Sequence, residues 1–337
     1  GTLGPGEMPV QSKEELIEDL KRALNDISQF AKNHDVILVN LADERAFERI
    51  AAIDDAVEKI LKSDDDRDAF LNKAHVVDAL FKAILPDTRA GEFYPLAQVV
   101  RTMARKIKSL RPVVDISKVT GAIEEVLDQS IQARDYKIHE PGAPYDLSKI
   151  DFDLLRERFE KGKKRIETEM LRGKVHAKIN RMIHRNPLRM DFLEVYQQMI
   201  EEYNAGSRNV EDLFAGLIKL AQELEDEEER AIREKLTEEQ LAVFDYLTRP
   251  GPDLNEKEIE EVKQIAREMM DTLKKEKLVL DYRKRQQSRA AVKVYIRDMV
   301  WKLPEAYSET MCQEKSDQIY QHVYDKYWGP EQSVYMN

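Results

Sequence analysis

The stretch GPDLNEKEIEEVK, residues 251–263, contains the residue types of a metal-dependent nuclease site. Asp253 follows a proline, and one residue separates Glu261 from Lys263, which is the order found in PD-(D/E)xK nucleases. In that chemistry the acidic side chains and the lysine share a metal ion and a water. Glu261 and Lys263 would then need one face of a β-strand, where side chains two residues apart point the same way. The local secondary structure therefore decides between a nuclease site and a coincidence.

The residues around this stretch predict a helix. Asn255 is a good N-cap, and Glu258 stands three residues later, where it completes a capping box. Apolar residues recur at helical spacing at Ile259, Val262, Ala266, Met269 and Leu273. Residues two apart in a helix lie about 200° apart around the axis, so Glu261 and Lys263 diverge. We therefore predict a helix start and no nuclease site here.

Other catalytic signatures are missing from the sequence. Gly162-Lys163 and Gly173-Lys174 lack the upstream glycine of a P-loop, and no His-Glu-x-x-His or Gly-x-Ser-x-Gly pattern occurs. His176 and His184 lie eight residues apart on one predicted helix, which is too far for neighbours sharing a metal. We predict no catalytic residue, no metal ligand and no cofactor in this chain.

The acidic run SDDDRD (63–68) raises the possibility of a calcium loop. An EF-hand would require glycine at 69 and glutamate at 75, whereas Ala69 and His75 stand there. Carboxylates at a helix N-terminus, with Ser63 as the cap, account for the run better.

Composition predicts a helical protein with an acidic surface. The chain has 337 residues, a net charge of −11 and 35% charged residues, which excludes a uniformly basic nucleic-acid-binding surface. Twelve glycines and twelve prolines are sparse among abundant helix formers. The single cysteine, Cys312, and the lack of a long apolar run favour a cytoplasmic protein that does not enter membranes. We predict an all-α fold, an irregular multi-helix array with a long central helix and a C-terminal helical bundle.

Turn residues divide the chain into blocks. Residues 35–41 (DVILVNL) are read as helical, with a short strand as the alternative, and Pro86, Gly91, Pro95 and Pro112 are expected to interrupt the next region. A long helix should follow residue 151 and end at Asn186, because Pro187 disfavours helix before it. The predicted parts are a linker or tag remnant (1–11), an N-terminal helical block (12–138), a central block with the long basic helix (139–250), and a C-terminal subdomain (251–337).

Two stripes of basic residues occur at helical spacing. The first basic stripe comprises Lys174, Lys178, Arg181 and Arg185, in a segment that precedes the acid-rich residues 201–240. The second basic stripe comprises Arg285, Arg289, Lys293 and Arg297. Such stripes are solvated faces, or pair internally with the acidic segment, or contact a phosphate backbone or an acidic partner. Without base-reading motifs, DNA contact through them would be salt-sensitive and independent of sequence.

Extended segments of the chain resemble a known family. They are DLSKIDFDLLRERF (146–159), RNPLRMDFLEVYQQMIEEYNAGSRNVEDLFAGLIKLAQEL (185–224), LTEEQLAVFDYLT (236–248) and DYRKRQQSRAAVKVYIRDMVWKL (281–303). Together they look like the C-terminal region of the restriction/motor (R) subunit of type I restriction enzymes. The similarity is close over 146–328 and weaker over 12–145, and it lies in a helical region rather than in catalytic signatures.

The resemblance implies a role rather than an active site. In this family the intact subunit is an ATP-dependent DNA translocase and site-specific endonuclease, a hydrolase whose nuclease and motor domains precede this region. ATP and Mg²⁺ are expected only in those domains, whose motifs do not occur here, so the chain resembles a non-catalytic fragment. The family implies docking of the motor subunit onto the methyltransferase and specificity subunits, beside duplex DNA. The alternative is a stand-alone helical domain that binds the DNA backbone.

Aromatic residues are concentrated near the C-terminal end. Tyrosine and tryptophan are enriched in interface hot spots, so these side chains are candidate partner-binding residues. The alternative is that they close the local helical bundle. The candidates are Trp301, Tyr320, Tyr324, Tyr327 and Trp328.

Overall fold

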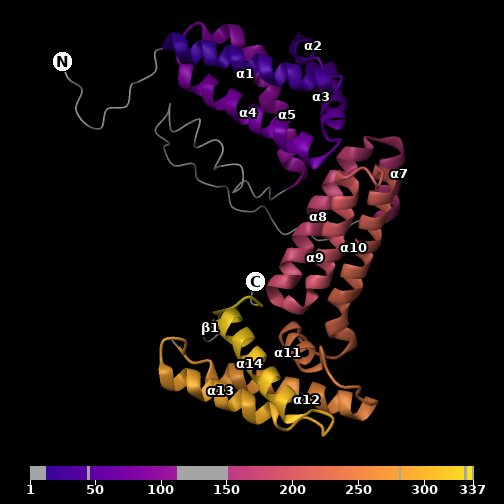
Figure 1. Ribbon diagram of the computed structural model, residues 1–337, viewed down its shortest axis with the longest axis vertical. Helices are drawn as coiled ribbons and strands as arrows, with labels where there is room; N and C mark the ends of the chain where they lie inside the picture. The colour runs from indigo at the N-terminus through magenta and orange to yellow at the C-terminus, as the bar shows by residue number, and fades with distance from the viewer. Residues whose placement is uncertain (1–12, 44–45, 112–150, 281, 330–331, 336–337) are drawn as a thin grey trace, which may run out of the picture. The chain divides into compact units, whose positions relative to one another are not determined.

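The computed structural model describes residues 13–43, 46–111, 151–280, 282–329 and 332–335. Within these ranges the chain is helical apart from turns and one two-stranded sheet, which confirms the predicted all-α class. The helices are α1 (Lys13–Asn33), α2 (Leu38–Asp43), α3 (Ala46–Ile60), α4 (Asp64–Ile84), α5 (Ala90–Leu110), α7 (Phe152–Lys161), α8 (Lys164–Arg185), α9 (Met190–Asn204), α10 (Val210–Arg233), α11 (Glu238–Thr248), α12 (Glu256–Thr272), α13 (Gln286–Val300) and α14 (Glu309–Lys326) (Figure 1). No helix among them is long and apolar enough to cross a membrane.

The chain divides into two compact units. The N-terminal unit comprises Gly1–Ala177 and Gln197–Lys219, and the C-terminal unit comprises Lys178–Tyr196 and Leu220–Asn337. The division therefore falls within α8, α9 and α10. The boundary predicted between residues 138 and 139 lies outside the described residues, which resume at Asp151, the N-cap of α7.

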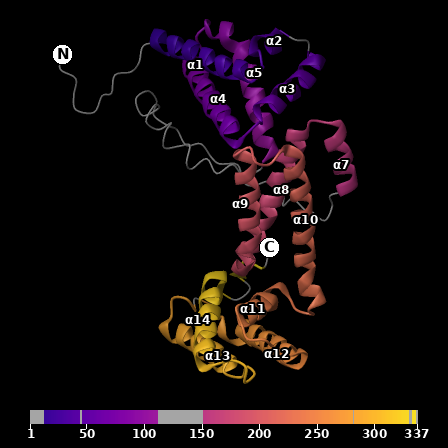
Figure 2. The ribbon, with the colours of Figure 1, turned by 45° about the vertical axis from the view of Figure 1, so that its right-hand side comes forward.

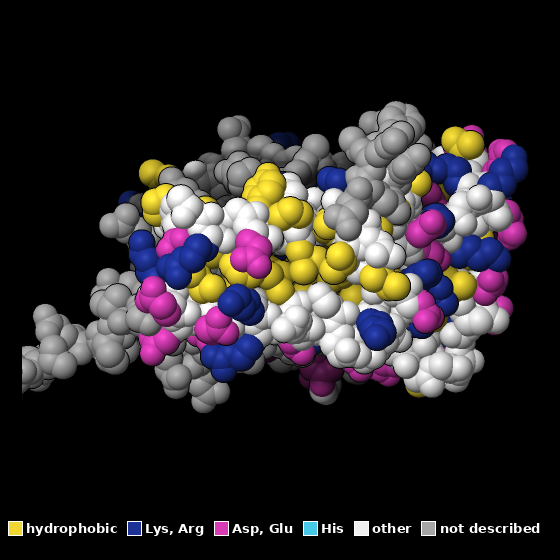
Figure 3. Space-filling model, turned by 90° about the horizontal axis from the view of Figure 1, so that it is seen from above, with side chains coloured by type: hydrophobic (Ala, Val, Ile, Leu, Met, Phe, Trp, Pro, Cys, Tyr) yellow, Lys and Arg dark blue, Asp and Glu magenta, His cyan; other side chains and the backbone are white. Residues whose placement is uncertain are grey.

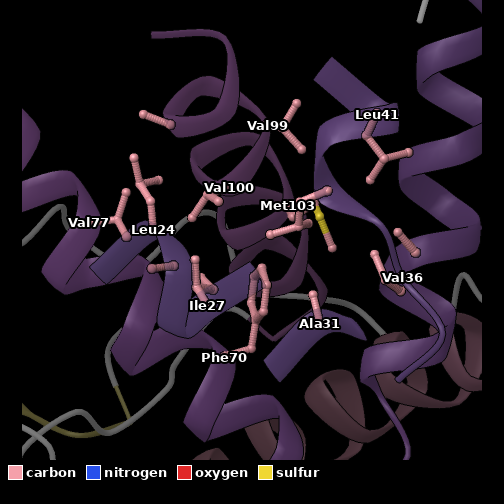
Figure 4. Close-up of a cluster of buried hydrophobic side chains, with 14 of the residues drawn as sticks. Leu24, Ile27, Ala31, Val36, Leu41, Phe70, Val77, Val99, Val100 and Met103 are labelled. Atoms are coloured by element: carbon pink, nitrogen blue, oxygen red, sulfur yellow. The ribbon is translucent and has the colours of Figure 1, made fainter. Parts of the chain in front are cut away.

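Helices α1, α4 and α5 form the centre of the N-terminal unit. Helix α4 packs along both α1 and α5, and α2 and α3 pack on α5. Leu24 and Ile27 of α1 point into the same cluster as Phe70 of α4 and Met103 of α5 (Figure 4). Each such buried side chain stabilises the fold by about 1.5–3 kcal/mol relative to its exposure to water. The periodic apolar residues of the sequence thus become one core.

Local structure matches the sequence in some places and departs from it in others. Residues 35–41 contain no strand, since α2 begins at Leu38, so the helical reading is confirmed. Pro95 lies inside α5 rather than interrupting it, which corrects our expectation. Pro95 is the sixth residue of α5, so the helix continues without the hydrogen bond that its N–H would have donated to the Gly91 carbonyl.

The predicted long basic helix is divided in two. Helix α7 ends at Lys161 and α8 begins at Lys164, with Gly162 between them. A Cβ atom at Gly162 would lie 2.5 Å from the carbonyl oxygen of Arg158, so this tight break requires glycine. Helix α8 ends at Arg185, as expected from Pro187, and Asn186 caps the 3₁₀ turn Pro187–Arg189.

Helices α11 to α14 build the core of the C-terminal unit. Helix α11 packs on α12 and α14, and α13 packs along α14 (Figure 2). A π-helical turn, Leu273–Lys277, follows α12. Strands β1 (Tyr327–Gly329) and β2 (Gln332–Ser333) pair antiparallel after α14, with Tyr327 opposite Ser333.

Candidate interaction surfaces

The nuclease-like residues lie on a helix and do not converge. Asn255 and Glu258 form the predicted capping box at the start of α12, so the helical prediction is confirmed. Glu261 pairs with Lys257 at 3.7 Å, whereas Lys263 pairs with Glu234 at 2.6 Å. Asp253 lies in the exposed segment before the helix. Glu261 and Lys263 are thus engaged in separate ion pairs.

The acidic run at 63–68 forms a helix start and a buried charge network. Ser63 caps α4 by accepting a hydrogen bond from the backbone N–H of Asp66, as predicted. Asp64 contacts Arg111 and Arg172 at 2.8 Å each. Burial would raise the pKa of Asp64, but the two arginines outweigh it and lower that pKa far below its usual range. Asp64 therefore joins helices of the N-terminal unit as a structural carboxylate.

Histidines of α8 show no sign of a metal site. Burial is the main cause that lowers the pKa of both His176 and His184. Arg111 and Arg172 lower that of His176 further, and Lys326 and Arg185 lower that of His184 further. No group of three or more His, Cys, Asp or Glu suited to a metal occurs among the residues that the structure describes.

One residue of the first basic stripe is engaged within the protein. The side chain of Lys178 is only 1% exposed and forms an ion pair with Glu228 of α10, in the acid-rich segment. Lys174, Arg181 and Arg185 are half-buried along α8. Lys178 of the first basic stripe is therefore part of the interior of the C-terminal unit.

A second buried network, which the sequence analysis missed, holds the C-terminal unit together. Asp245 of α11 is 1% exposed and accepts hydrogen bonds from Arg230 at 2.8 Å and from Asn186 at 2.7 Å. Arg189 is likewise buried and pairs with Glu227 at 2.9 Å. The sequence did indicate a buried carboxylate here, because Asp245 interrupts the apolar residues of LAVFDYLT.

The second basic stripe lies on the surface of the C-terminal unit. Arg285, Lys293 and Arg297 are exposed and Arg289 is half-buried along α13. Lys293 pairs with Asp317 of α14 at 2.9 Å, and Arg297 pairs with its neighbour Asp298 at 3.2 Å. Exposed pairs of this kind are weak, so the cations can exchange these partners for a ligand's anionic groups.

The C-terminal aromatic residues differ in exposure. Trp301 is 49% exposed and Trp328 is 46% exposed, whereas Tyr327 is only 3% exposed and belongs to the core. Tyr320 and Tyr324 are half-buried on α14, with ring centroids 6.3 Å apart. Tyr327 therefore closes the bundle, and the two tryptophans face solvent.

Aromatic and basic side chains meet where α13 begins and α14 ends. The Arg283 guanidinium lies 4.8 Å from the ring centroid of Tyr324 and 5.7 Å from that of Trp328. Lys293 Nζ lies 5.7 Å from the ring centroid of Tyr320. We call the set the aromatic–basic surface; it comprises Arg283, Arg289, Lys293, Tyr320, Tyr324 and Trp328. Arg283 was not a sequence candidate, because it precedes the four-residue repeat of the stripe.

A buried histidine anchors the C-terminal strands. His322 Nε2 lies 3.0 Å from the hydroxyl oxygen of Tyr335, which itself donates to the Arg185 carbonyl at 2.6 Å. Because the tyrosine proton is used for Arg185, Nε2 carries the hydrogen, and Nδ1 is buried with no hydrogen-bond partner among the described residues. Burial is the main cause that lowers the pKa of His322, to about 4.

Hydrophobic side chains are exposed on the N-terminal unit. Figure 3 shows yellow hydrophobic side chains gathered between groups of charged ones. Ile37 and Val39 at the start of α2 are 57% and 53% exposed, and Ile50 of α3, which packs beside α2, is 64% exposed. Grouped exposed apolar residues are typical of protein contact surfaces.

Comparison with known proteins identifies the family. A family model described as type I restriction enzyme HindI endonuclease subunit-like, C-terminal, matches residues 5–325. No curated protein and no solved structure matched the chain. The resemblance carried by the segments between 146 and 303 is confirmed, and the match includes the N-terminal helical region. The chain therefore belongs to the family of C-terminal domains of type I restriction enzyme HindI-like endonuclease subunits.

Proposed function

We propose that this domain is a non-catalytic helical module that docks the motor subunit of a type I restriction enzyme onto its methyltransferase and specificity subunits. The family match over 5–325 supports the proposal, since the family comprises C-terminal domains of type I restriction enzyme endonuclease subunits. ATP and Mg²⁺ would be bound by other domains of the parent subunit, and DNA cleavage would take place there.

Exposed apolar side chains support a docking role. Trp301 follows directly after α13, and Leu280, which is 66% exposed, precedes that helix. Tryptophan truncation at interfaces is often costly because a large apolar area returns to water. The N-terminal unit adds Ile37 and Ile50, so each unit offers a surface to a partner protein.

Co-migration with the partner subunits tests this proposal. The chain should elute together with a complex of methyltransferase and specificity subunits in size-exclusion chromatography at low salt. Trp301→Ala should reduce the bound fraction about tenfold or more, as expected for an interface tryptophan. Tyr94→Ala is the matched control, because Tyr94 is an aromatic side chain of similar exposure, at 53%, outside the proposed surfaces. Separate elution of the unmodified chain would contradict docking.

A second candidate function is contact with the backbone of duplex DNA through the second basic stripe. The exposed Arg285, Lys293 and Arg297 favour it. Each phosphate contact should contribute about 0.9 to the slope of log affinity against log salt, so affinity should fall steeply with added salt. Arg285→Glu with Arg297→Glu should weaken binding, while Lys257→Gln should not, since Lys257 is an exposed cation of α12 outside the stripe. Undetectable duplex binding at about 50 mM salt would exclude this candidate.

A further inference from the structure

We propose that the aromatic–basic surface of the C-terminal unit binds an unpaired nucleic-acid strand. The proposal deepens the second candidate function, because it names the form of nucleic acid that this face prefers. It rests on two features that meet there, a run of cations without acids and a group of aromatic rings.

The charge of this region differs from that of the chain. Residues 282–297 contain six basic residues and no Asp or Glu, in a protein whose net charge is −11. Asp317 of α14 contacts the surface and pairs with Lys293, and hydrogen bonds from Gln313 and Lys293 lower its pKa. The run holds four arginines and two lysines within 16 residues, and closely spaced cations of this kind suit a chain of phosphates. The charge pattern therefore favours a nucleic acid as the ligand.

Aromatic residues of α14 and β1 contact two cations of this run, Arg283 and Lys293. Tyr320 and Tyr324 are one helical turn apart on α14, and Trp328 follows four residues later in β1. Arg283 contacts the rings of both Tyr324 and Trp328, so the three side chains form one continuous group. Lys293 extends the group to Tyr320, and Arg289 donates a hydrogen bond to the Arg283 carbonyl. Three aromatic rings thus each contact a cation of the run.

Base stacking explains why the strand should be unpaired. Phosphate contact requires only cations and does not distinguish a duplex from a single strand. In a duplex the flat faces of the bases are covered by their neighbours, whereas unpaired bases can stack on aromatic rings or on an arginine guanidinium. Trp328, at 46% exposed, and the Arg283 guanidinium beside it are suited to that contact. The aromatic component therefore predicts a preference for single strands.

Fluorescence measurements on the full chain test the preference. The probes are a labelled oligothymidine of about 15 nucleotides, which spans a typical single-strand site, and a labelled duplex of the same length. Anisotropy at about 50 mM salt should show tighter binding of the single strand than of the duplex. The chain has two tryptophans, so in a Trp301→Phe background the fluorescence comes from Trp328, and stacking should quench it.

Variants separate stacking from charge. Trp328→Ala should weaken single-strand binding about 5- to 100-fold, the range for the loss of one stacked base, and leave duplex binding unchanged. Lys293→Gln should lower the single-strand salt slope by about 0.7, the contribution of one phosphate contact. Tyr94→Ala and Lys257→Gln are the aromatic and cationic controls, and neither should change the affinity.

The outcomes distinguish this inference from the proposals above. Equal affinity for both probes without tryptophan quenching would overturn the inference and leave backbone contact in place. A second outcome would also overturn the inference. The chain would co-migrate with the methyltransferase and specificity subunits, lose this co-migration in Trp328→Ala, and bind no nucleic acid. The surface would then be assigned to protein docking.

Discussion

Acidification should destabilise the C-terminal unit through His322. In the folded protein burial holds the pKa of His322 at about 4, while the unfolded chain has a histidine pKa near 6.5. The unfolded state therefore binds more protons between these values, so the free energy of unfolding falls as the pH drops from about 6.5 towards 4. The structural cause is Nδ1, which would gain a proton where no acceptor is described.

The expected size follows from the two pKa values. The titration of His322 should lower the free energy of unfolding by about 2 kcal/mol at pH 4.5 relative to pH 7. Two tyrosines contact the His322 ring: Tyr246 of α11, with ring centroids 5.0 Å apart, and Tyr335. Of the nearby charges, Lys326 lowers the pKa of His322 and Asp325 raises it. Urea unfolding followed by tryptophan fluorescence reports on this unit, because both tryptophans lie in it.

The His322→Gln variant isolates the histidine from other titrating groups. Glutamine keeps a donor for Tyr335 but cannot be protonated. Between pH 7 and pH 4.5 the free energy of unfolding of the unmodified chain should fall by about 2 kcal/mol more than that of the variant. An unchanged difference over that range would show that His322 is protonated as easily in the folded as in the unfolded state, and would refute the reasoning.

Three further predictions concern buried charges and the nuclease-like stretch. Asp245→Asn should lower the free energy of unfolding in urea by about 1.5–3 kcal/mol, because it removes a buried charged hydrogen-bond partner of Arg230, which keeps Glu227. Asp298→Asn, in an exposed pair, should cost below about 1 kcal/mol; similar costs would contradict the buried network. Asp64→Asn should lower the thermal stability measured by circular dichroism, and the loss should be greater at pH 7 than near pH 3. A lowered pKa stabilises fully above the unfolded value of about 3.9, and this contribution decreases as the pH falls below that value towards the folded pKa; an equal loss at both pH values would refute this. Supercoiled plasmid with Mg²⁺ should remain uncut, and cleavage that Lys263→Ala abolishes would contradict the helical geometry of α12.

Local sequence patterns determined the helices and several of their ends. The capping box of Asn255 with Glu258 forms as its spacing predicts. Capping depends on side chains three residues apart, so the information lies entirely in the local sequence. The same locality settled the nuclease question, because a helix separates Glu261 from Lys263 whatever packs around it.

Tertiary structure alone decided which charged and aromatic residues are available to a ligand. Lys178 and Arg285 belong to two similar stripes, yet Lys178 is buried against Glu228 and Arg285 is exposed. Helical spacing places residues on a common face, but only the packing of distant segments determines whether that face meets acids or water. For the same reason the sequence could not separate Tyr327 in the core from Trp328 on the surface, or bring Arg283 against the rings of α14.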